Sequence, residues 1–92
     1  MAEQPLSSLT LHTAQPKGLA DPAVRRNVEA AAHALGERMG VPLHHLHLDD
    51  STAELSIGGP PIVALGFGAE LRRSTDRWHH AHYGTRLWRE TR

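Results

Sequence analysis

The chain has 92 residues, no cysteine, and ten acidic residues against ten basic ones. This length suits one small domain, and the lack of cysteine excludes disulfides, thiolate catalysis and cysteine-based zinc sites. No apolar run approaches the ~20 residues of a membrane span, and the N-terminus lacks a secretory leader pattern. We therefore expect a cytoplasmic protein with no membrane contact and one domain over residues 1–92, frayed at 1–5 and 90–92.

Two elements are predicted in the first half of the chain. Alternating apolar and polar residues over 6–14 are typical of a strand. Asp21 followed by Pro22 marks a helix start, because aspartate can cap free amides and proline needs no hydrogen bond at the first helical position. Gly40 can take the left-handed conformation that ends such a helix. The apolar stripe of this helix recurs at three- and four-residue intervals: Val24, Val28, Ala31, Leu35 and Met39.

A hairpin is predicted around Asp49-Asp50-Ser51, which separates two alternating segments. A tight turn centred on residues 50 and 51 would place Leu48 opposite Ala53 and His47 opposite Glu54. A shift of one residue would move the apolar side chains to the wrong face, so the register is well specified. The polar face of the hairpin would then carry His45, His47, Glu54 and Ser56.

The last third of the chain is predicted to be mostly helical. Residues 62–65 fit either a short buried strand or the lead-in to a helix over 68–83, which could kink at 74–76. Leu87 and Trp88 are expected to fold back onto the core. The order β-α-β-β-α predicts an α+β domain, in which a small antiparallel sheet of about three strands carries two helices on one face.

Six of the eight histidines form two clusters, one in the hairpin and one in the second helix. His45 and His47 share one strand face, and His79 and His82 are neighbours on a helix. Imidazole is a common ligand of zinc and nickel, and Glu54 could complete a site or orient His47. These five residues are the candidate ligands of a divalent metal, zinc or nickel. The alternative is that the histidines are simply solvated.

The zero net charge conceals an asymmetry along the chain. Residues 1–65 contain four basic and seven acidic residues, whereas residues 66–92 contain six arginines and three acidic residues. Arginine and aromatic side chains bind phosphates and stack on bases, which makes nucleic acid one candidate partner. The same residue types are enriched at protein–protein hot spots. The candidate surface comprises Arg72, Arg73, Arg77, Trp78 and Trp88, and both tryptophans are also candidates for the core.

No enzyme signature is present, since the chain has neither a Gly-x-Ser-x-Gly elbow nor a complete phosphate-binding loop. The sequence favours a non-enzymatic domain that acts by self-association or by binding another protein. A free sheet edge would allow a homodimer by strand addition across a two-fold axis. Metal binding and nucleic-acid binding are the alternative hypotheses.

Overall fold

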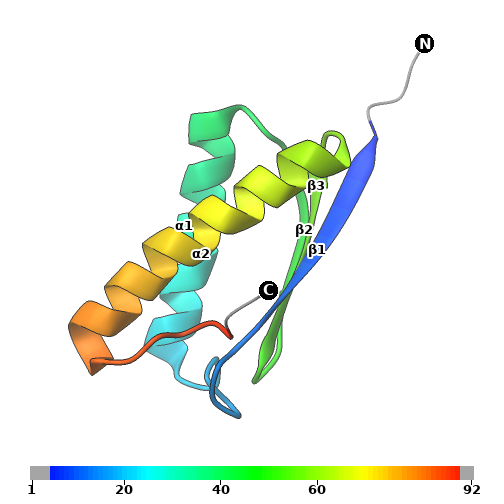
Figure 1. The fold of residues 1–92 in the computed structure, drawn as a ribbon. Coiled ribbons are helices and arrows are strands. Elements are labelled where there is room, and N and C mark those ends of the chain that lie inside the picture. Colours follow the sequence, from blue (N-terminus) through cyan, green and yellow to red (C-terminus); the bar gives the residue numbers. More distant parts are fainter. Residues whose placement is uncertain (1–4, 90–92) are drawn as a thin grey trace.

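A computed structural model describes residues 5–89, and it confirms the predicted α+β fold and element order. The strands are β1 (Leu6–His12), β2 (Leu43–Leu48) and β3 (Thr52–Gly58), and the helices are α1 (Pro22–Met39) and α2 (Pro61–Tyr83). All strand pairs are antiparallel and β3 lies in the centre, so β1 and β2 are the two sheet edges. Both helices cover the same face of the sheet (Figure 1). Residues 1–4 and 90–92, part of the segments expected to fray, lie outside the described residues.

Helix α1 has the predicted caps. The Asp21 carboxylate accepts a hydrogen bond from the Ala23 N–H at 2.8 Å, and Gly40 ends the helix with φ of 67°. The buried stripe differs from the predicted one by including Ala32 and Gly36, whereas Met39 is 39% exposed. Gly36 is buried because the chain returns against it, and a Cβ at this position would lie 3.0 Å from the Val41 carbonyl oxygen.

The hairpin has the predicted register, with Leu48 opposite Ala53 and His47 opposite Glu54. The Asp49 side chain holds the turn by accepting hydrogen bonds from the Ser51 and Thr52 N–H groups at 2.9 and 2.7 Å. Hydrogen bonds from Thr52 and from the Ser51 backbone hold the pKa of Asp49 below its usual value. An irregularity that the sequence did not indicate shifts the β2 register between residues 43 and 45.

Helix α2 decides between the two interpretations of residues 62–65, because it begins at Pro61 and contains them. The predicted break at residues 74–76 is absent from the described helix, which continues to Tyr83. Thr75 is accommodated because its hydroxyl donates to the Leu71 carbonyl at 2.6 Å. No helix within residues 5–89 is long and apolar enough to cross a membrane.

The C-terminal segment folds back onto the core, as predicted for Leu87 and Trp88. Both side chains are buried, and the Trp88 indole N–H donates to the Thr75 hydroxyl at 2.7 Å. Trp88 also forms an isolated antiparallel bridge with Thr13, just beyond the end of β1. We call residues 87–89 the C-terminal strap. The strap follows the end of α2 and returns to the end of β1 (Figure 1), where it bonds His12 and Ala14.

Candidate functional site

The outer edge of β1 is one of the two edges of the described sheet. Backbone groups of an antiparallel strand face its two neighbours alternately. The Thr13 N–H donates inward to the Ser51 carbonyl, whereas the His12 carbonyl accepts from the Arg89 N–H on the outer side at 2.7 Å. Even-numbered residues therefore direct their N–H and C=O groups outward. No other described segment pairs with the outward groups of Leu6, Ser8 and Thr10.

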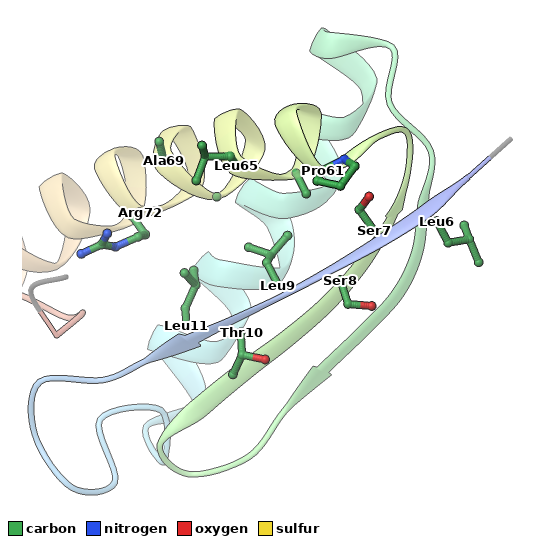
Figure 2. Close-up of a pocket in the computed structure, with 12 residues that line it drawn as sticks. Leu6, Ser7, Ser8, Leu9, Thr10, Leu11, Pro61, Leu65, Ala69 and Arg72 are labelled. Atoms are coloured by element: carbon green, nitrogen blue, oxygen red, sulfur yellow. The ribbon is translucent and has the colours of Figure 1, made fainter. Parts of the chain in front are cut away.

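An apolar groove of about 640 Å³ runs along this edge, between β1 and α2. Ser7, Leu9 and Leu11 point from β1 toward the helix, as Figure 2 shows, and Leu65 and Ala69 border the groove from α2. The Leu65 side chain is 71% exposed. The two elements approach closely at Gly68, where a Cβ would lie 2.9 Å from a methyl carbon of Leu9. The groove therefore presents apolar surface beside backbone groups that find no partner within residues 5–89.

The strap occupies the end of the same edge. The Ala14 N–H donates to the Leu87 carbonyl at 2.8 Å, and the Arg89 N–H donates to the His12 carbonyl at 2.7 Å. These bonds flank the isolated antiparallel bridge between Thr13 and Trp88, so the strap pairs with the chain at and just beyond the end of β1. The outer edge of β1 thus has a covered end at His12 and an open part from Leu6 to Thr10.

The strap contacts the part of α2 that carries the predicted arginines. Asp76 on α2 accepts hydrogen bonds from the Leu87 and Trp88 N–H groups at 2.8 and 3.1 Å. The Arg72 guanidinium donates to the Arg89 carbonyl at 2.9 Å. The strap therefore lies along the turns of α2 that carry the predicted arginines. We call the resulting set the basic surface: Arg72, Arg73, Arg77, Arg86 and Arg89.

The two predicted tryptophans have different environments. Trp88 is 1% exposed, so its side chain belongs to the core. Trp78 is partly buried and stacks on His82, with ring centroids 4.3 Å apart, and it meets Tyr83 edge-on at 6.0 Å. The Tyr83 hydroxyl donates to Asp21 at 2.9 Å, which joins the end of α2 to the start of α1. That bond raises the pKa of Tyr83 above its usual value, and it lowers the pKa of Asp21 together with the bond from the Ala23 N–H.

The candidate metal ligands lie in two separate places. His45 and His47 lie on the uncovered face of the sheet beside Glu54, and their ring centroids are 6.4 Å apart. His79 and His82 lie at the end of α2, where their Nδ1 atoms are 2.7 and 2.8 Å from backbone carbonyl oxygens. Within residues 5–89, no three potential ligands converge in a way that could hold a metal ion.

Sequence reasoning identified the arginines but missed the groove. The missed residues are Ser8, Leu65 and Ala69, which border or flank the open edge. A signal was available in the sequence, because no charged residue occurs between Glu3 and Lys17, in a stretch that includes all of β1. Leu65 was a second signal, since it is an apolar residue outside the core-facing positions of its helix.

Comparison with solved structures finds proteins of similar fold. The chain resembles a crystal structure described as a "putative transposase" from Deinococcus radiodurans, with a TM-score of 0.77 and 17% sequence identity. The match covers 99% of this chain and 77% of that chain. No protein-family model and no curated protein matches the sequence. At this identity the likeness supports the α+β fold and says nothing further about activity.

Proposed function

We propose that this protein is a non-enzymatic domain that self-associates, with β1 of one copy adding to β1 of a second copy across a two-fold axis. The observation that carries the proposal is the open part of the β1 edge, where backbone groups that pair with no other segment of residues 5–89 lie beside an exposed apolar groove. Strand addition would satisfy the backbone groups, and the groove would be covered at the same time.

A second copy suits this surface because the open edge is self-complementary. From Leu6 to Thr10 the strand carries no charge, so two copies can approach without like-charge repulsion. The two α2 helices would contact each other over the joined strands, and Leu65 of each copy would become buried. An apolar side chain that is fully buried contributes about 1.5–3 kcal/mol. Of the basic surface, Arg72 lines the groove and would border this contact, whereas Arg73, Arg77, Arg86 and Arg89 do not line it.

Sedimentation velocity at micromolar concentration tests the proposal. The 10.1 kDa chain should sediment as a dimer, and Leu65→Lys should convert it to a monomer. Ile62→Lys is the matched control, because Ile62 is also 71% exposed on α2 but does not line the groove. Circular dichroism should show both variants folded. A monomeric natural chain, or equal dimer loss in the two variants, would overturn the proposal.

Nucleic-acid binding is the second candidate, and it is favoured by the way the strap lies along α2. The basic surface draws five arginines from two segments, and Arg73 among them forms an ion pair with Glu70 at 3.2 Å. Asp76 is the only acidic residue between Glu70 and Glu90 in the sequence. Asp76 is engaged by two backbone N–H groups of the strap. Arginine can contact phosphate with two parallel hydrogen bonds. The description of the structural neighbour as a transposase is compatible with such a role.

Binding of a fluorescent single-stranded oligothymidylate tests this second candidate. Affinity should fall with salt, with a log–log slope of about −0.7 for each phosphate contacted. The Arg77→Ala/Arg89→Ala double variant should weaken binding about tenfold and flatten that slope. Arg26→Ala is the control, because Arg26 is an exposed arginine on α1. Absence of saturable binding at low salt, or an equal loss in the control, would exclude the candidate.

A further inference from the structure

We infer that the C-terminal strap sets the register of the dimer, so that the two β1 strands pair about Ser8. This inference rests on the proposed self-association and specifies its geometry. The strap already occupies the outer edge opposite His12, where its Arg89 N–H donates to the His12 carbonyl. A partner strand therefore has only the open part of β1, from Leu6 to Thr10, available for pairing.

The positions of the outward backbone groups favour an axis through Ser8. The outward N–H and C=O groups of the open part belong to Leu6, Ser8 and Thr10. A two-fold axis at Ser8 pairs Ser8 of one copy with Ser8 of the other. It also pairs Leu6 of each copy with Thr10 of the other. All of these outward groups are then used, in about six hydrogen bonds, two for each of three directly bonded pairs. The β1 strand of the second copy, which begins at Leu6, then pairs no further than Thr10 and does not overlap the strap.

The neighbouring registers are worse for identifiable reasons. An axis at Leu9 would place Leu6 of one copy opposite His12 of the other, where the Arg89 backbone already lies. An axis at Ser7 would leave the outward groups of Thr10 opposite residue 4 rather than a residue of β1. The strap thus acts as a stop at one end of the edge, and the length of β1 limits the other end.

The side chains are compatible with the Ser8 register. Ser8, Leu6 and Thr10 point away from α2, on the uncovered face of the sheet (Figure 2). Leu6 would lie directly across from Thr10 of the second copy, an apolar side chain beside a β-branched one. On the helix side, Leu9 would lie across from Ser7 of the second copy. The exposed Leu6 side chain, which is 61% accessible in one copy, would gain a neighbour.

Single cysteine variants test this register cleanly, because the natural chain has no cysteine. Residues in a directly bonded antiparallel pair have Cα atoms about 5.5 Å apart, which suits a disulfide. Under a mild oxidant, Ser8→Cys should form a disulfide dimer at least tenfold faster than Thr10→Cys. Thr10→Cys is the matched control, since its two copies would lie four residues apart along the strands. A mixture of Leu6→Cys and Thr10→Cys chains should give the cross-linked heterodimer, identified by mass.

The outcomes separate the register from the dimer itself. If the natural chain sediments as a dimer but Ser8→Cys cross-links no faster than Thr10→Cys, the Ser8 register is wrong and self-association stands. If the heterodimer of Leu6→Cys and Thr10→Cys does not form from a dimeric chain, the register is also overturned. If the chain sediments as a monomer, the proposed function itself fails.

Discussion

The two edges of this small sheet are built in opposite ways. The β1 edge pairs with β3 in an unbroken register over seven residues, and its open part carries no charge. The β2 edge is interrupted by the register shift between residues 43 and 45 and carries three exposed histidines. At its far end, the Arg25 guanidinium donates to the Leu48 carbonyl at 3.3 Å. Bulges and polar groups of this kind are the usual protection of an edge strand.

Of the two edges of the described sheet, the β1 edge is therefore the one suited to strand addition. Irregular pairing twists an edge and misaligns its donors and acceptors, so a second strand finds few partners on β2. The β1 edge lacks such protection along its open part and lies beside the apolar groove. The strap protects its remaining end. The asymmetry of the edges therefore selects the interface that we propose.

Removing the side chain that anchors the strap, which protects one end of the β1 edge, should have the largest effect on stability. Trp88→Ala removes the largest fully buried side chain of the described core and should cost about 3–5 kcal/mol of unfolding free energy. That is a large fraction of the stability expected for a domain of this size. Urea denaturation measures the loss. The control is Arg89→Ala, which changes an exposed side chain in the same strap and should alter stability by less than about 0.5 kcal/mol. A loss as large as that of Trp88→Ala would contradict the anchoring role of Trp88.

A smaller effect is expected from the hydrogen bond that orients Trp88. Thr75→Val keeps the shape of the side chain but leaves the buried indole N–H without its acceptor, which should cost about 1–3 kcal/mol. Thr75→Ser retains the hydroxyl and should lose less. Thermal and urea unfolding of the pair measure the difference. Equal stabilities for valine and serine would show that this bond does not hold the strap against the β1 edge.

Acid should act on the turn beside β2 through Asp49. Hydrogen bonds hold its folded pKa below the usual value of 3.8, so the folded state favours the ionised form. The stabilising contribution is fully present above about pH 4 and is lost as the pH falls through the folded pKa. Asp49→Ala should therefore show a shallower loss of stability below pH 4 than the natural chain. If the free energy of unfolding falls equally steeply below pH 4 in both proteins, Asp49 does not cause the acid sensitivity.

The smallest effect is expected for the metal hypothesis on the β2 face. His45 and His47 are fewer ligands than a closed structural site requires, and no three potential ligands converge within residues 5–89, so we expect only weak binding of zinc on this face. Calorimetric titration should show that His45→Ala/His47→Ala abolishes this binding, whereas His79→Ala/His82→Ala leaves it unchanged. Unsaturable binding, or equal effects of the two double variants, would rule out a site on this edge.

Several elements were predictable because local chemistry determines them. The Asp21 cap, the left-handed Gly40 and the alternation around residues 49–51 are short-range signals, and each specified its element correctly. The start of α2 was not predictable in this way. Residues 62–65 are a short apolar run, and such a run fits a buried strand and a helix equally well. The preceding glycines and prolines permit either continuation.

The candidate sites were only partly predictable. The sequence identified Arg72, Arg73 and Arg77, but pairing between the strap and β1 placed Arg89 beside Arg72. Sequence periodicity also cannot tell a covered sheet edge from an open one, because both strands have the same alternation. The groove depends on where α2 crosses β1, and on the close approach at Gly68 that permits it.

The residue composition of the surfaces, the order of the elements and the register of the hairpin can all be predicted from the amino-acid sequence. These follow from side-chain periodicity and capping, which act over a few residues. The tertiary structure decided which edge of the sheet is open, because that depends on strand order and on a strap that returns from the far end of the chain. Contacts between residues 12 and 89 arise only when the helices have packed on the sheet, so no local pattern encodes them.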